Sequence, residues 1–166
     1  MDIHSLMNDF SKFDGAKIGF GPLHPLHPQK ALAGNIKHFL DTYPFLEQDE
    51  GYIQFLQLYA GASIFKKDSI WMVDILGFTD NTICSPIAAM EGDIIDEYGF
   101  LMYSYIVIET RPIGSRQLSF AFDSTIQHPQ GIYRVFADAP NAWHWYCPSF
   151  LIWLERLIAC EGRLDS

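Results

Sequence analysis

The chain changes character at residues 51–61, which read GYIQFLQLYAG. Four large apolar residues of this segment recur at the spacing of one helix face: Tyr52, Phe55, Leu56 and Tyr59. This spacing predicts a helix over residues 47–60 that buries one of its faces. Gly61 suits the position after a helix C-terminus, and beyond it the residue pattern becomes that of strands. The segment therefore separates a helical first part of the chain from a sheet.

Two further helices are predicted before this segment, over residues 4–13 and 29–43. The second has the clearest amphipathic stripe in the chain: Leu32, Ile36, Phe39, Leu40 and Tyr43. Between the two helices, residues 19–28 read GFGPLHPLHP. Proline lacks an amide hydrogen and disfavours helical geometry in the residue before it, so an extended path is expected there.

The second half of the chain is rich in Val, Ile, Tyr and Phe, which favour strands. Strands are predicted over residues 69–78, 100–110, 117–124 and 131–138. No helix is predicted between them, so consecutive strands are expected to pair antiparallel. Residues 81–99 are too many for a hairpin loop. Pro148 and Ser149 begin a final helix, which Gly162 is expected to end.

These elements predict one α+β domain over residues 1–166. It has an antiparallel sheet of about four to six strands, flanked by N-terminal helices and one C-terminal helix. Residues 1–30 are expected to form an N-terminal helix with a proline-rich extension, and residues 31–162 the core. A chain of 166 residues, 49% of them hydrophobic, has the size and composition for one core.

A cytoplasmic location is predicted from three features. No run approaches the ~20 apolar residues of a membrane-spanning helix. The first 15 residues contain acids and no continuous apolar segment, which differs from a secretory signal. The cysteines, Cys84, Cys147 and Cys160, share no CxxC spacing, so reduced thiols are expected rather than disulfides or a zinc site.

The negative charge of the chain is concentrated in one part of the sequence. The chain has 20 acidic and 11 basic residues, for a net charge of −9. Residues 68–110 contain no Lys, Arg or His, yet they hold these carboxylates: Asp68, Asp74, Asp80, Glu91, Asp93, Asp96, Glu97 and Glu109. A patch of one sign steers a partner of the opposite sign and disfavours nucleic acids and anionic membranes as partners. Alternatively, these acids only keep an aromatic-rich domain soluble.

The residue patterns predict no catalytic residue, no cofactor and no metal site. His24 and His27 have HxxH spacing, but the proline between them prevents a helix that would bring both imidazoles to one ion. Asp93 and Asp96 lack the alternating pattern and central glycine of a calcium loop. Cys147, three residues after a histidine, could be a nucleophile, but a packed thiol beside a helix is the preferred interpretation.

Two segments at opposite ends of the predicted core resemble the SUKH superfamily, the Smi/Knr type of bacterial immunity protein. The 51–61 segment looks like the family's Tyr-x-x-Phe-Leu helix, which runs into Tyr-Asn-Gly. Residues 148–158, PSFLIWLERLI, resemble its Ser-Phe-x-x-Phe-Leu closing helix. Residues 118–123 and 131–133 are similar to its two late strands.

The resemblance spans about residues 44–158 and departs from the family pattern at two positions. Ala60 stands where the family usually has Asn, and Gly51 replaces an acidic or polar residue. Residues 19–28 and 81–99 do not align with the family. The shared residues are packing residues, so the resemblance implies a fold and a class of protein rather than a chemistry.

The resemblance implies a non-enzymatic binding protein. Many SUKH members look like immunity proteins that block a co-encoded toxin, often a nuclease, and others look like adaptors in cell-wall regulation. We therefore expect a toxin-neutralising protein that occludes a basic protein partner with its acidic surface. The alternatives are a regulatory adaptor that uses its tryptophans and an unrecognised hydrolase. The predicted partner-binding residues are Asp74, Asp80, Glu91, Asp93, Asp96, Glu97, Trp143 and Trp145.

Overall fold

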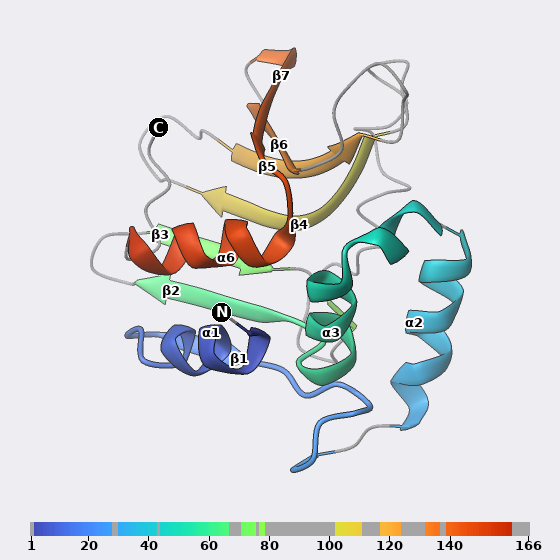
Figure 1. Cartoon of the computed structure of the whole chain (residues 1–166). Coiled ribbons are helices and arrows are strands. Elements are labelled where there is room, and N and C mark those ends of the chain that lie inside the picture. Colours follow the sequence, from blue (N-terminus) through green and yellow to red (C-terminus); the bar gives the residue numbers. More distant parts are fainter. Residues whose placement is uncertain are drawn as a thin grey trace.

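Helices, strands and a last helix follow one another in the predicted order, apart from a strand over residues 16–18, in a computed structural model that Figure 1 shows. The structure describes residues 2–27, 30–42, 44–66, 71–75, 77–78, 102–110, 117–123, 132–136 and 139–160. The segment over residues 81–99 lies outside these ranges. Among the described residues, no helix has both the length and the apolar character needed to cross a membrane.

The predicted helices are confirmed, with shorter bounds. They are α1 (Ile3–Phe10), α2 (Lys30–Thr42), α3 (Glu50–Leu58) and α6 (Phe150–Ala159). A 3-10 helix that the sequence did not predict, η1 (Pro44–Gln48), lies between α2 and α3. The helix predicted over residues 47–60 is divided, because Asp49 leaves helical geometry and accepts the Tyr52 amide hydrogen as the N-cap of α3. Ser149 caps α6 as expected, but α6 ends at Ala159, before Gly162.

The sheet is antiparallel, which confirms the α+β class. Its strands pair in sequence order: β1 (Ala16–Ile18), β2 (Ala62–Lys66), β3 (Trp71–Ile75), β4 (Met102–Thr110), β5 (Gln117–Asp123), β6 (Ile132–Phe136) and β7 (Ala139–Cys147). Strands β3, β4, β5 and β6 match predicted strands, whereas β1, β2 and β7 were not predicted. The sequence missed β7 because it contains Pro140, which edge strands tolerate, and β7 ends the strand order among the described residues.

One hydrophobic cluster joins the helices to the sheet. Six residues of α3 and α6 are buried in it: Tyr52, Phe55, Leu56, Phe150, Leu154 and Leu157. Helix α1 contributes Ile3, Leu6 and Phe10 to the same cluster, so the predicted boundary at residue 30 does not separate two packing units. Helices α1, α3 and α6 contact one another, and they lie over one side of β2 and β3 in Figure 1.

An extended segment, residues 19–23, runs along the C-terminal end of α3, and we call it the N-terminal strap. The amide hydrogens of Gly19, Gly21 and Leu23 are donated to the carbonyls of Gly61, Leu58 and Gln57, over 2.8, 2.9 and 2.9 Å respectively. These bonds satisfy carbonyls that the end of a helix otherwise leaves without partners. The strap donates from every second residue, so Pro22, which has no amide hydrogen, falls at a position where none is needed.

Two unusual positions in the 51–61 segment have structural reasons. A Cβ on Gly51 would lie 2.4 Å from Cγ of Leu151, so glycine at this position allows α3 to approach α6 closely. Ala60 has the left-handed φ of 56° and Gly61 a φ of 141°. The chain therefore leaves α3 through two residues of positive φ, the first of them in the conformation that asparagine tolerates better than alanine.

The strap predicts a large difference between two Gly→Ala substitutions. At Gly21, a Cβ would lie 2.2 Å from the Gln57 carbonyl oxygen, and a backbone atom cannot move away as a side chain can. Gly21→Ala should lower the free energy of unfolding by about 1–3 kcal/mol, as overpacking does. Gly34→Ala is the control, because its Cβ would meet nothing within 4 Å in α2 and should stabilise the helix by roughly 0.5–1 kcal/mol. Urea denaturation measures both, and equal stability of the two variants would contradict the strap contacts.

Candidate functional site

Three of the eight predicted partner-binding residues lie within the described residues. Asp74 is in β3, opposite Ser63 of β2 and Ile108 of β4. Trp143 and Trp145 are in β7, opposite Val135 and Tyr133 of β6. The other five lie outside the described residues: Asp80, Glu91, Asp93, Asp96 and Glu97.

The strand order separates Asp74 from the two tryptophans. Strands β4, β5 and β6 lie between β3 and β7, which at ~4.8 Å per strand is roughly 19 Å across the sheet. The structure therefore brings Trp143 and Trp145 together on one strand, but it does not bring Asp74 next to them. A partner that touches all three residues must cover a broad face of the sheet rather than enter a small site.

Trp145 is exposed on a part of β7 that is held firmly. Its exposed fraction is 48%. Among the described residues, the other exposed large hydrophobic side chains are two leucines. The next residue, Tyr146, accepts a hydrogen bond at its carbonyl from Nη1 of Arg156 over 2.8 Å, and the same guanidinium lies 5.0 Å from the centre of the Tyr146 ring. Helix α6 thus contacts the backbone beside Trp145, and an exposed indole is well suited to anchoring a partner.

Cys147 has the surroundings of a packed thiol. It is buried, its Sγ donates a hydrogen bond to the Ser149 carbonyl over 3.4 Å, and burial raises the pKa of the thiol to about 11. A thiol with this pKa is protonated at neutral pH, whereas the thiolate is the nucleophile. These properties are those of a packed thiol, the interpretation preferred from the sequence.

His24 and His27 surround an aromatic ring. The centres of both imidazoles lie 4.5 Å from the centre of the Phe20 ring. Nδ1 of His24 accepts the Leu26 amide hydrogen over 3.2 Å, and burial lowers the pKa of His24, as do the nearby charges of His27 and His4. No group of three or more His, Cys, Asp or Glu residues in the described part of the chain could hold a metal ion.

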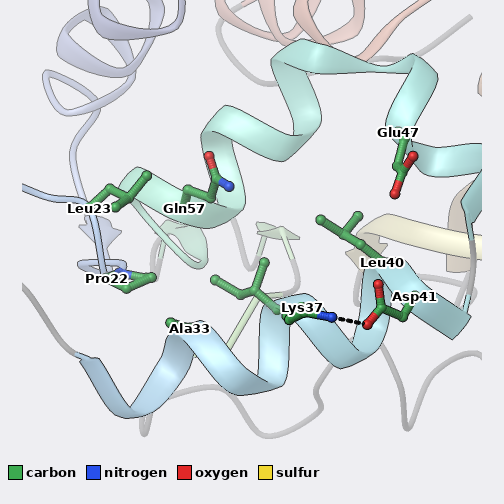
Figure 2. Close-up of a pocket in the computed structure, with 9 residues that line it drawn as sticks. Pro22, Leu23, Ala33, Lys37, Leu40, Asp41, Glu47 and Gln57 are labelled. Atoms are coloured by element: carbon green, nitrogen blue, oxygen red, sulfur yellow. Dashed lines mark hydrogen bonds and ion pairs between the residues drawn. The ribbon is translucent and has the colours of Figure 1, made fainter.

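A groove that the sequence did not predict lies between α2 and the C-terminal end of α3. It has a volume of about 280 Å³, and Figure 2 shows its lining. We call it the α2–α3 groove and define it by Pro22, Leu23, Ala33, Ile36, Leu40 and Glu47. Leu40 belongs to the apolar stripe of α2, yet it is only partly buried and faces this groove. The partial exposure of one residue in a helical stripe cannot be read from its spacing.

The charged residues at the groove differ in their partners. Lys37 and Asp41 form an ion pair across one turn of α2, and this bond raises the pKa of Lys37. Glu47 is exposed at the other side of the groove, and its carboxylate makes no hydrogen bond or ion pair within the described residues. Lys37, the only cation among the lining residues, is therefore already paired with Asp41. The carboxylate of Glu47 is available to a partner.

No family model matches the chain, and neither a curated protein nor a solved structure matches it significantly. The SUKH resemblance therefore stays a prediction that depends on the two helices and the late strands.

Proposed function

We propose that this protein is a non-enzymatic binding module of the SUKH immunity type, which neutralises a co-encoded basic toxin by occluding it. The observation that carries the proposal is the acidic segment over residues 68–110, which contains eight carboxylates and no Lys, Arg or His. Carboxylates without a cation nearby in the sequence leave their field available to a partner. A nuclease is a fitting target, because a cleft that binds phosphates is basic and an acidic face competes for it.

The exposed indole of Trp145 supports the proposal as an anchor for a protein partner. It lies in the same sheet as Asp74, which belongs to the acidic segment, with Trp145 in β7 and Asp74 in β3. We therefore propose that the partner covers part of the sheet rather than entering a small site.

The free thiols of the two described cysteines, Cys147 and Cys160, are in keeping with a reducing compartment. We therefore propose a cytoplasmic location, where an immunity protein meets its toxin before the toxin leaves the cell or after it enters.

The proposal predicts association that depends on salt. The protein encoded beside this chain should bind it with a rate constant that falls steeply as the Debye length shrinks from ~10 Å at 0.1 M salt to ~3 Å at 1 M. The variant with Asp93→Asn, Asp96→Asn and Glu97→Gln should associate more slowly at low salt and lose most of the salt dependence. Stopped-flow fluorescence measures both rates.

The control for this experiment removes the same charge elsewhere. Asp14, Glu50 and Glu155 are exposed and lie outside the acidic segment. The variant with Asp14→Asn, Glu50→Gln and Glu155→Gln should keep most of the association rate, because steering depends on where the charge lies. A rate that does not respond to salt, or full affinity in the first triple variant, would return the acidic segment to a solubilising role.

The adaptor alternative is favoured by one observation, the exposure of Trp145 beside the Arg156 contact. In that case Trp145→Ala should abolish partner binding, and the neutralised acidic variant should bind as the unmodified protein does. The same association measurement thus distinguishes the two functions.

A further inference from the structure

The α2–α3 groove is small for a metabolite. Its volume of about 280 Å³ lies just below the ~300–1,000 Å³ of pockets that bury drug-sized ligands. It is partly open to solvent. A shallow site of this volume suits one or two side chains of a protein partner, as an anchor pocket in an interface does.

Both walls of the groove are held in place by hydrogen bonds or by packing in the core. Pro22 and Leu23 belong to the N-terminal strap, whose amide hydrogens are bonded to the end of α3 on either side of Pro22. The opposite wall is α2, which is anchored in the core by Ile36 and Phe39. A site that is already formed costs little ordering entropy when a partner binds.

An exposed apolar side chain stands at the rim of the groove. Leu23, which lines it, has an exposed fraction of 60%. Only Leu26, three residues later in the chain, is a more exposed large aliphatic residue among the described ones, at 74%. Exposed apolar side chains at the rim of a pocket are typical of an interaction site.

The charge at the rim favours a cationic partner. Glu47 has no partner among the described residues, while the ammonium of Lys37 is paired with Asp41. An incoming Lys or Arg would meet an available carboxylate, whereas an incoming acid would meet Glu47 and Asp41 unfavourably. The net charge of −9 acts in the same direction at longer range.

We propose that the α2–α3 groove binds a short segment of a basic protein. One aliphatic side chain of that segment enters between Pro22, Ile36 and Leu40, and an adjacent Lys or Arg pairs with Glu47. This inference rests on the proposed function only for the basic character of the partner, and it adds an anchor outside the acidic segment.

The test uses the dipeptide N-acetyl-leucyl-arginine amide as the probe and the full chain as the receptor. Titration followed by 1H–13C spectra should give saturable shifts of the methyl signals of Leu23, Ala33, Ile36 and Leu40. Replacing the leucine of the probe by glycine should weaken binding at least tenfold, because the buried aliphatic contact is lost. Replacing its arginine by glutamine should weaken binding about three- to fivefold, as expected for an exposed ion pair.

Variants of the protein separate the two contacts. Glu47→Gln should weaken binding of the arginine probe by the same three- to fivefold and leave the glutamine probe unaffected, whereas Glu50→Gln is the matched control and should change neither. Ala33→Leu should fill the groove and lower the affinity at least tenfold. Gly34→Leu, on the neighbouring exposed position of α2 where a Cβ meets nothing within 4 Å, should leave the affinity unchanged.

Several results would overturn the inference. Methyl shifts that do not saturate at millimolar probe, or that persist in Ala33→Leu, would show that the groove does not bind the aliphatic side chain. Equal affinity for the arginine and glutamine probes would show that the groove does not prefer a basic segment. A dimer that Ala33→Leu dissociates would assign the groove to a second copy of this chain. Because the titration contains no toxin, a failed association assay together with a normal titration would overturn the proposed function alone.

Discussion

Replacement of Asp49 by alanine is expected to lower the free energy of unfolding by about 2–4 kcal/mol. One carboxylate oxygen accepts the Tyr52 amide hydrogen over 3.1 Å and so caps α3. The other accepts the Phe150 amide hydrogen at the start of α6 over 2.8 Å, from a residue 101 positions later in the chain. Alanine would remove the cap, at ~0.5–2 kcal/mol, and leave a buried donor of α6 unsatisfied, at ~1–3 kcal/mol.

Asp2 provides a matched control for this substitution. Asp2 is exposed and caps α1 by accepting the Ser5 amide hydrogen over 2.8 Å, and this bond lies within α1 alone. Asp2→Ala should therefore cost only about 1 kcal/mol. Asp49→Asn keeps one side-chain oxygen as an acceptor and should be more stable than Asp49→Ala, which provides a folded variant if alanine prevents folding. Urea denaturation of all three variants measures the differences, and equal losses at Asp49 and Asp2 would contradict the link between α3 and α6.

Leu56→Ala is expected to lower the free energy of unfolding by about 2–5 kcal/mol. Leu56 is fully buried in the cluster that joins α3 and α6 to the sheet. Aromatic rings pack densely in this cluster: the centre of the Phe150 ring lies 5.0 Å from that of Phe55 and 5.4 Å from that of Tyr52. A truncated side chain leaves a cavity that such neighbours fill only in part, which adds to the lost burial of the methyl groups.

Leu26→Ala is the control for the core substitution, because Leu26 is largely exposed. Its effect on the free energy of unfolding should stay within ~0.5 kcal/mol, as for most surface substitutions. Both variants should keep the urea m-value of the unmodified protein. An unchanged m-value shows that a substitution altered the stability and not the surface exposed on unfolding. If Leu56→Ala left the free energy of unfolding nearly unchanged, α3 would not be part of the core.

The helices were predictable because their signal is local. The spacing of apolar residues in α2, α3 and α6 depends only on neighbours within a few turns, and the structure buries the faces so indicated. The cap at Ser149 was predictable for the same reason, since its partner is the Ile152 amide hydrogen three residues on. Strand β1 escaped prediction because three residues carry too little pattern, and only their pairing with β2 identifies them.

The candidate surfaces also differ in whether the sequence alone could predict them. The acidic segment follows directly from the sequence, because charge needs no partner to be counted. The sequence also singled out Trp145, but its exposure beside the α6 contact emerged only from the structure. The sequence did not predict the α2–α3 groove, because its walls come from the strap and from α2. These two segments come close together only because each of them contacts α3.

The sequence by itself determined the α+β class, the buried faces of the helices and the concentration of acids over residues 68–110. Only the tertiary structure decided that Asp49 links the starts of α3 and α6, that the strap closes the end of α3, and that a groove opens beside it. The physical reason is the range of the interactions. Hydrophobic periodicity and charge are properties of neighbouring residues, whereas these hydrogen bonds and the groove require the chain to bring distant segments together.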